Sequence, residues 1–527
     1  MTVSRDADVI VIGSGMGGLA AAALLAKLYG RKVIVLERHF RAGGFTHTFR
    51  RPGGYEWDVG IHYVGELGRR GLLQSAMKVT TGGGLRWARM PEVYDRLVFP
   101  ELEFGVRAGK QNFRDDLVAT FPAEREGIER FFEDVVEASS WSTVLGMRST
   151  APRAVSSLAS ALMRRRRKLA LQTTGEWLSS NIRDERLRAV LGARWGDYGL
   201  PPAQSAFFAH AVIATHYLSG AYYPVGASGG IAQGAEQVIR AAGGEVRVNA
   251  EVASIVVDRG HARGVRLKSG EELRAKVVVS DAGARTTYLR LLSEDVPVPF
   301  RSKLASVPLG LGHVSLYLGL SRSPAELGVK GENFWLHDEL DHDRLFARRG
   351  ELAQGRAPQV YLSFPSLKDP EAKGHTAEVI TGVDGAMFAP WAGSQWMKRG
   401  DDYLALKARI SEALLSAVEK RLPGMTALVS HQELSTPLST EHFTGHRGGE
   451  IYALPATPER FDTPWLSALT PVKGLYLTGA DALMLGVGGA LMAGVMCAAA
   501  IEGPMTIKRM TEAANELPSP VWSAAQP

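Results

Sequence analysis

The chain has 527 residues, which is too long for one simple core, so we expect two domains or more. Its composition, 45% hydrophobic and 22% charged residues, is typical of a globular protein and excludes a disordered or fibrous one. The modest net charge of +6 excludes a uniformly basic nucleic-acid binder. The single cysteine, Cys497, excludes an internal disulfide and a cysteine-based metal site, and it favours a cytoplasmic location.

The first 65 residues predict a βαβ unit. Residues 8–13, DVIVIG, form a continuous apolar, β-branched run that is typical of a buried strand in a parallel sheet. Residues 19–30, LAAAALLAKLYG, are strong helix formers that end in a glycine, and residues 31–38, RKVIVLER, predict a second buried strand.

The turn between the first strand and the helix carries a dinucleotide-binding pattern. Gly13, Gly15 and Gly18 occupy the glycine positions of G-x-G-x-x-G, where they permit a tight turn, close approach of a pyrophosphate and close helix–strand packing. Glu37 ends the second strand nineteen residues after Gly18, where an acidic side chain can bind an adenosine ribose. A glycine-rich turn without a ligand is the alternative interpretation.

Farther along the chain, α/β texture alternates with other patterns. We expect an α/β fold in which one domain is assembled from three chain segments and a second, α+β domain is inserted into it. The first domain is expected to comprise residues 1–65, 223–290 and 440–505, the inserted domain residues 66–222 and 291–439, and a Pro- and Ser-rich mobile tail residues 506–527.

A C-terminal run, Thr478–Ile501, has the length of a membrane-spanning helix, because the twenty residues after Asp481 carry no charge. Its glycines argue against a span, since irregular backbone is not tolerated facing lipid. Residues 9–26 are equally uncharged, yet they predict a strand, a phosphate-binding turn and a helix. We therefore interpret the run as a strand, turn and helix that close a cofactor site.

Several motifs together resemble the FAD-binding amine oxidase and phytoene desaturase superfamily. They are the second Gly-Gly turn in RHFRAGGF, the following GYEWDVG, the segment EVASI and the C-terminal GLYLTGAD. The segments GIHYVGE, TGAD and ARWGDYGLPPAQSAFFAHAVIATHYLSGAYYPVGASGGIAQGAEQVI resemble its retinol saturase and carotenoid isomerase branch.

The resemblance implies a Rossmann-like domain with non-covalently bound FAD and, in the inserted domain, a pocket for a hydrophobic polyene or isoprenoid lipid. The protein would be an FAD-dependent oxidoreductase of the saturase or desaturase type that exchanges hydride between flavin N5 and a carbon–carbon bond. The residues expected to contact the cofactor are Gly13, Gly15, Gly18, Glu37, Arg38, Gly43, Gly44, Phe45, Asp58, Gly60, Val252, Asp281, Gly479, Asp481, Gly488 and Gly489.

Such a reaction also needs a proton donor or acceptor near the flavin. Histidine exchanges protons near neutral pH and tyrosine can donate from a pocket wall, so the candidates are His62, Tyr63, His210, His216 and Tyr217. Packing or substrate positioning is the alternative role for each of them.

Three other activities use the same scaffold: redox-neutral cis–trans isomerisation of a polyene with reduced FAD, oxidation of an amine, and a non-catalytic, flavin-binding membrane adaptor. Gly310-Leu311-Gly312 lacks the rest of a dinucleotide fingerprint, so we infer no NAD(P)H site. The electron donor or acceptor is therefore unidentified.

One segment concentrates the positive charge. Between Trp141 and Gly175 there are seven basic residues and no acidic one. Val155, Leu158, Leu162 and Leu169 recur at helical spacing beside the basic residues Arg164, Arg165, Arg166, Arg167 and Lys168, which predicts a basic amphipathic helix at a membrane surface. A solvated helix face or a disordered loop is the alternative. Nucleic acid is not expected, because aromatic residues are not interleaved with the charges.

Histidines and acids also gather in residues 337–343, HDELDHD. The stretch lacks a metal-binding histidine pair at helical spacing, so we expect a solvated loop and no metal site.

Overall fold

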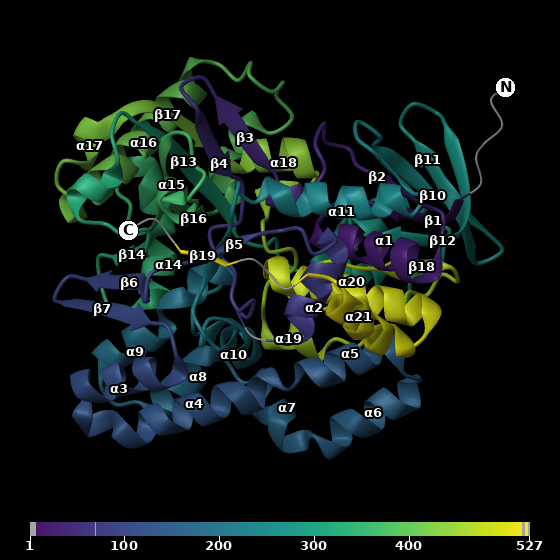
Figure 1. Cartoon of the computed structure of the whole chain (residues 1–527), viewed down its shortest axis with the longest axis horizontal. Helices are drawn as coiled ribbons and strands as arrows, with labels where there is room; N and C mark the ends of the chain where they lie inside the picture. Colours follow the sequence, from purple (N-terminus) through teal and green to yellow (C-terminus); the bar gives the residue numbers. More distant parts are fainter. Residues whose placement is uncertain (1–6, 69, 519–521, 525–527) are drawn as a thin grey trace.

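The structure is a computed structural model, and it describes residues 7–68, 70–518 and 522–524. Two seven-stranded sheets and a layer of helices form most of it, with a small three-stranded sheet (β19-β5-β8) and the pair β3-β4 beside them (Figure 1). In that view the first sheet lies to the right, the second to the left, and the helices between residues 110 and 181 run along the lower edge.

The first sheet joins strands from distant parts of the sequence. Its order is β10-β11-β12-β1-β2-β9, and β18 also pairs with β12. β1 is parallel to both β2 and β12, as expected for a βαβ opening. The bounds are Ala7–Ile12 (β1), Val33–Leu36 (β2), Glu245–Arg247 (β9), Val252–Asp258 (β10), His261–Leu267 (β11), Glu272–Ser280 (β12) and Leu475–Leu477 (β18). The α/β class is confirmed.

Two helices of small residues pack against each other beside this sheet. In α1 (Met16–Tyr29) every residue from Met16 to Ala26 is buried, and Gly30, with φ 61°, ends the helix. A Cβ built on Gly494 of α20 (Gly486–Glu502) would lie 2.6 Å from both the Ala20 Cβ and the Gly17 carbonyl oxygen of α1. The glycine and alanine content of the C-terminal run therefore permits close helix packing. Among the described residues, no helix is long and apolar enough to cross a membrane.

The second sheet has the order β17-β13-β16-β15-β14-β6-β7 and is antiparallel except between β14 and β6. All nine residues of β13 are buried, because helix α16 (Asp401–Arg421) contributes Ile410 and Leu414 to the core against one face. The bounds are Val93–Phe99 (β6), Leu102–Arg107 (β7), Gly312–Leu320 (β13), Asn333–His337 (β14), Gln359–Ser363 (β15), His375–Val383 (β16) and Val429–Ser435 (β17).

The helical layer has an aromatic core that includes Phe131, Phe132, Trp177 and Phe207. Its helices are α3 (Lys110–Thr120), α4 (Arg125–Ser139), α5 (Ser142–Thr150), α6 (Arg153–Leu162), α7 (Arg164–Leu171), α8 (Thr174–Asn181), α9 (Glu185–Gly192) and α10 (Phe207–His216). The prediction of one basic amphipathic helix is wrong, because the chain leaves helical geometry at Met163 (φ −90°, ψ 27°). The apolar residues of α6 and the basic residues of α7 therefore belong to two helices.

The remaining elements connect these layers. They are β3 (Thr48–Arg51), β4 (Tyr55–Asp58), α2 (Leu72–Thr81), β5 (Trp87–Arg89), β8 (Tyr222–Pro224), α11 (Gly229–Ala241), α12 (Ala284–Thr286), α13 (Arg301–Ser306), α14 (His342–Ala347), α15 (Pro365–Lys368), α17 (Met425–Leu428), α18 (Pro437–Thr444), α19 (Pro458–Asp462), α21 (Met505–Glu516) and β19 (Trp522–Ala524).

The segment predicted as a mobile tail begins with helix α21, which buries Thr506, Met510 and Ala514. Strand β19 then pairs with β5. The prediction is therefore wrong for residues 506–516, because an amphipathic helix precedes the Pro- and Ser-rich part. Residues 519–521 and 525–527 of the predicted tail lie outside the described residues.

Candidate functional site

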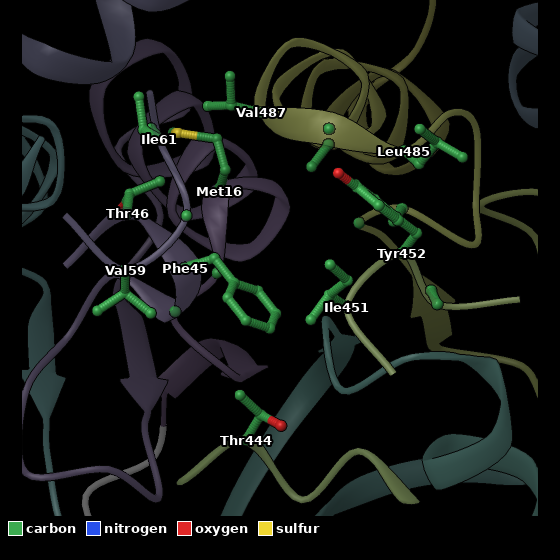
Figure 2. A pocket seen from close by; sticks show the side chains of 18 of the residues that line it. Met16, Phe45, Thr46, Val59, Ile61, Thr444, Ile451, Tyr452, Leu485 and Val487 are labelled. Atoms are coloured by element: carbon green, nitrogen blue, oxygen red, sulfur yellow. The ribbon is translucent and has the colours of Figure 1, made fainter. Parts of the chain in front are cut away.

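A cavity of about 1970 Å³ lies where the two sheets and the helical layer meet. Figure 2 shows part of its wall: Met16 and Ile61 face Tyr452 across the space, with Phe45 and Ile451 below them. Known small-ligand pockets measure roughly 300–1,000 Å³, so this cavity has room for a cofactor and a second ligand together.

Two backbone turns of the cavity wall meet at the Asp281 carboxyl group, and a third packs against the first of them. A Cβ built on Gly15 would lie 2.4 Å from Asp281 Oδ2, and one built on Gly479 would lie 2.3 Å from Asp281 Oδ1. A Cβ on Gly44 would lie 3.1 Å from the Gly15 Cα atom. Burial, together with the nearby charge of Glu37, raises the pKa of Asp281 to about 8. At these glycines the backbone lies so close to Asp281 or to a neighbouring turn that a side chain would not fit.

Glu37 ties the first turn to the second strand. Its Oε2 accepts hydrogen bonds from the Ser14 backbone N–H (2.9 Å) and hydroxyl (2.6 Å), and its Oε1 accepts one from the His39 N–H (2.7 Å). The carboxylate also faces the cavity, where lone pairs remain to accept from a ribose hydroxyl.

Most of the residues predicted to contact the cofactor line this cavity: Gly13, Gly15, Glu37, Arg38, Gly43, Gly44, Phe45, Gly60, Val252, Asp281, Gly479, Gly488 and Gly489. Gly18 does not; a Cβ there would lie 2.4 Å from the Gly13 carbonyl oxygen, so it serves helix–strand packing.

The prediction of direct cofactor contact needs correction at two acidic residues. Asp58 is fully buried, accepts from the Tyr223 hydroxyl and the Ser228 N–H (2.9 Å), and does not line the cavity. Asp481 accepts from the Ala284 N–H (2.7 Å) and the Leu454 N–H (3.0 Å) behind the cavity wall. Both carboxyl groups hold neighbouring loops together, because buried backbone N–H groups need acceptors.

The geometry fits FAD. Helices α1 and α20 both begin at the cavity, and neither start has a side-chain cap. A helix N-terminus with free N–H groups and a positive dipole end suits a diphosphate. When bound, FAD supplies a ring that takes up or gives up hydride.

Of the five candidate proton-transfer residues, His62, Tyr63, His216 and Tyr217 line the cavity and His210 does not. His210 is buried with its Nδ1 3.2 Å from the Tyr198 hydroxyl, so we withdraw it as a candidate. Burial lowers the pKa of His62 to about 3, which leaves its ring neutral at physiological pH.

His216 and Tyr217 have structural contacts of their own. His216 Nε2 accepts the Gly65 backbone N–H at 2.8 Å, so the ring holds the loop after Tyr63. The Tyr63 and Tyr217 rings stack, with centroids 4.3 Å apart. The Tyr63 hydroxyl lies within hydrogen-bond distance of Asp197 Oδ2 (3.2 Å) and Asp95 Oδ2 (3.4 Å).

A network of buried charged groups, which the sequence did not reveal, lies beside these candidates. Lys368 is 1% exposed and donates hydrogen bonds to Asn333 Oδ1 (2.5 Å), Ser363 Oγ (2.7 Å) and the His62 carbonyl oxygen (2.9 Å). Asn333 donates to Asp95 Oδ1 at 3.1 Å. We define the buried polar network as Tyr63, Asp95, Arg194, Asp197, Asn333, Lys368 and Glu378.

Arg194, Glu378 and Asp197, the other charged members of the network, come from different elements and contact Asp95, His62 and Tyr63. Arg194 Nε lies 3.4 Å from Asp95 Oδ2, and Glu378 Oε2 lies 2.8 Å from His62 Nδ1. Asp197, in the short helix Ala193–Asp197, lines the cavity and accepts from the Tyr63 hydroxyl at 3.2 Å. One local signal existed: Asp95 occupies the same alternate positions of β6 as the buried Leu97 and Phe99.

The stretch 337–343 is not the solvated loop that we expected. His337 and His342 are buried, and the His337 ring stacks on Phe99. His342 Nδ1 accepts from the Trp195 indole (3.2 Å), and its Nε2 contacts the Ala189 carbonyl oxygen (2.7 Å). Within the described part of the chain no group of histidine, cysteine and acidic residues is arranged to hold a metal.

Comparisons with known proteins agree with this geometry. Residues 16–502 match the model of the flavin containing amine oxidoreductase family. The chain is 33% identical to an all-trans-retinol 13,14-reductase of Danio rerio, over 95% of this chain and 86% of the relative. It is 27% identical to a chloroplastic prolycopene isomerase of Daucus carota, over 94% of this chain and 80% of the relative.

Among solved structures, cyclohexylamine oxidase from Brevibacterium oxydans superposes with a TM-score of 0.60 at 19% identity, over 97% of this chain and 99% of the other. At that identity the likeness shows the fold alone. The family model, in contrast, spans nearly the whole chain, from α1 through α20, and includes Asp281 and the Gly479 turn beside it. The chain therefore belongs to the flavin containing amine oxidoreductase family, and its cofactor is FAD.

Proposed function

We propose that the protein is an FAD-dependent oxidoreductase that reduces a carbon–carbon double bond of a hydrophobic polyene or isoprenoid lipid. The observation that carries the proposal is the apolar extension of the cavity beyond the cofactor residues. Helices α4, α5 and α10 contribute Val136, Met147, Phe208, Val212 and Ile213 to its wall. An elongated apolar ligand would bury its length there, which is favourable by roughly 25 cal/mol per Å².

The relatives support the same substrate class. One is named for reduction of all-trans-retinol and the other for isomerisation of prolycopene, so both names refer to polyenes. In this chain the cavity places the apolar wall and the Tyr63–Tyr217 pair in one space with the cofactor-facing glycines. Exclusion of water by such a wall protects a hydride-transfer step.

The proposal predicts the behaviour of the reduced flavin. The purified protein is expected to show a flavin spectrum, and its chemically reduced form, kept without oxygen, is expected to reoxidise when all-trans-retinol or a carotene is added. Extraction and mass analysis should then show a product that has gained two hydrogen atoms.

Other outcomes identify the competing activities. A polyene whose geometry changes without a change in mass, while the flavin stays reduced, indicates an isomerase. Reduction of oxidised flavin by a primary amine, with no response to any polyene, indicates an amine oxidase and contradicts the proposal. The electron donor in the cell is a separate partner that this assay replaces by a chemical reductant.

We also propose that the protein attaches peripherally to an anionic membrane through α6 and α7, from which it collects its substrate. Val155, Leu158 and Leu162 of α6 are 49%, 61% and 79% exposed. The basic residues 164–168 of α7 are all exposed beside them. Helix α5, which precedes α6, lines the cavity, and the cavity residues Leu72 and Val136 are each 49% exposed. The cavity therefore reaches the surface near these helices.

Flotation with vesicles tests this attachment. The double variants Leu158→Ser/Leu162→Ser and Arg164→Gln/Arg166→Gln are each expected to bind vesicles of phosphatidylcholine and phosphatidylserine at least about tenfold more weakly. The first loses apolar area that would be buried in the bilayer, and the second loses two cations that each contribute roughly 1 kcal/mol near the surface. Arg167 is left intact since it pairs with Asp462 at 2.6 Å.

The matched control for flotation is Leu309→Ser, which changes a 45% exposed leucine outside α6 and α7. It should bind as the unchanged protein does. Equal flotation of all variants would remove α6 and α7 as the attachment surface.

A further inference from the structure

The buried polar network reaches the cavity through one carboxyl group. Asp197 lies at the end of the Ala193–Asp197 helix, is partly exposed and lines the cavity. The neighbouring Asp95 and Arg194 belong to the wall behind it and are almost fully buried. Of the three, Asp197 is therefore the group that a ligand in the cavity can touch.

Aromatic side chains line the cavity that Asp197 reaches. Trp195, Tyr63, Tyr217, Tyr361 and Tyr452 line the same cavity. Figure 2 shows Tyr452 at the wall opposite Met16, in the part of the cavity next to the α20 start. A carboxyl group in a cavity lined by aromatic rings is poorly solvated, which favours its neutral, protonated form.

We propose that Asp197, as a carboxylic acid, is the catalytic residue that donates the proton to the alkene carbon, with Tyr63 as the positioning residue that orients its carboxyl group. This inference rests on the proposed reduction of a double bond. The step breaks the Asp197 O–H bond and the C=C π bond and forms two C–H bonds. One carbon takes the proton, the other takes hydride from the reduced cofactor, and the carboxylate regains a proton from water.

The charges around Asp197 are consistent with a group that titrates near neutral pH. Burial and the negative charge of Asp95 raise the pKa of Asp197 to about 7, while Arg194 and the hydrogen bond from Tyr63 act in the opposite direction. Asp197 is thus substantially protonated at neutral pH, unlike an ordinary aspartate.

Among the titratable groups near it, the tyrosines and histidines keep their charge in this range, whereas burial raises the pKa of Glu378 to about 8. Burial raises the pKa of Tyr63, Tyr217 and Tyr361 well above the usual value, so these hydroxyls stay neutral. Burial lowers the pKa of His313 to about 4, and His62 is likewise neutral. Lys368, whose pKa burial lowers to about 8, contacts Asp95 only through Asn333.

The first test measures reoxidation of the reduced flavin by all-trans-retinol across pH 5 to 9. The rate for the unchanged protein should be level at low pH and fall about tenfold per pH unit above about 7, because the acid form is lost. Asp197→Asn should retain FAD and react at least about 100-fold more slowly, which is the size of effect that general acids typically supply. Its remaining rate should not show the fall near pH 7.

Tyr63→Phe should react more slowly but keep the fall in rate with pH. The fall should move to higher pH, because the hydrogen bond from Tyr63 lowers the pKa of Asp197 and the variant lacks it. The matched control Asp258→Asn changes an exposed aspartate in a hairpin of the first sheet and should behave as the unchanged protein. An Asp197→Asn variant with an unchanged rate and pH profile would overturn the proposal.

A second test does not depend on turnover. Infrared difference spectra of the resting protein between pH 5 and 9 should contain carboxylic-acid C=O bands from several buried groups, Asp281 and Glu378 among them. One component should disappear as the pH rises through about 7 and be missing from the spectrum of Asp197→Asn. If no polyene reoxidises the flavin but this band is present, the proposed reduction fails while the acid form of Asp197 stands. If the band is unchanged in Asp197→Asn, Asp197 is not the acid.

Discussion

Gly15→Val is expected to yield a protein that purifies without FAD. A Cβ at this position would lie 2.4 Å from Asp281 Oδ2, and the rest of the valine side chain would occupy the space that a diphosphate needs at the start of α1. The Kd for FAD should rise at least about 100-fold, which corresponds to about 2.8 kcal/mol. The measurement is the ratio of flavin to protein absorbance, with FAD released by denaturation as a check.

The control for this variant is Gly30→Asn at the other end of the same helix. Gly30 has a φ of 61°, which asparagine tolerates, and nothing lies within 4 Å of a Cβ built there. Gly30→Asn should therefore carry a full complement of FAD. Circular dichroism should show equal helix content for both variants, so that loss of cofactor is separated from loss of fold. One FAD per chain in Gly15→Val would contradict the assignment of this turn.

Lys368→Met is expected to lower the free energy of unfolding by about 3–5 kcal/mol, the usual result of removing one partner from a buried set of charges. The substitution leaves the Asn333 and Ser363 oxygens without their donor and removes the positive charge near Glu378, Asp58 and Asp95. The measurement is the thermal unfolding midpoint at saturating FAD, because bound cofactor itself stabilises the fold.

Two further variants make the Lys368 result specific. Lys303→Met changes an exposed lysine on α13 and should leave the midpoint unchanged. Lys368→Met/Glu378→Gln should recover part of the loss, because the buried carboxylate is then replaced by a neutral amide. A midpoint for Lys368→Met equal to that of the unchanged protein would show that the buried carboxyl groups do not need this cation.

The cofactor end of the cavity was predictable because its pattern is local. A strand, three glycines and an acidic residue occur within residues 8–37, and each has a physical requirement that can be recognised without tertiary structure. The resemblance extended this to Gly43, Gly44, Gly479 and Gly488, which line the cavity. Asp58 and Asp481 show the limit: the resemblance implied that they contact the cofactor, but their side chains accept from backbone N–H groups.

The substrate end could not be derived in the same way, because its residues come from elements far apart in the sequence. Tyr63 follows β4, Asp95 lies in β6, Asp197 follows α9 and Lys368 ends α15. No periodicity links them. Tyr63 was a candidate and the alternation in β6 marked Asp95, but nothing in the sequence joined these two residues to Asp197 and Lys368. The basic helix was mispredicted for a related reason, since a continuous apolar and basic pattern gives no sign of the break at Met163.

The pairing of β18 with β12 and the packing of α20 on α1 have a consequence for biosynthesis. The cofactor site combines the first turn after β1 with residues 479–489, so a ribosome must make nearly the whole polypeptide before the site is complete. Domains begin to fold during translation, but here FAD capture must follow it. Chains interrupted before residue 478 are expected to remain free of flavin and to expose the small-residue face of α1, which quality-control proteases would recognise as unfinished.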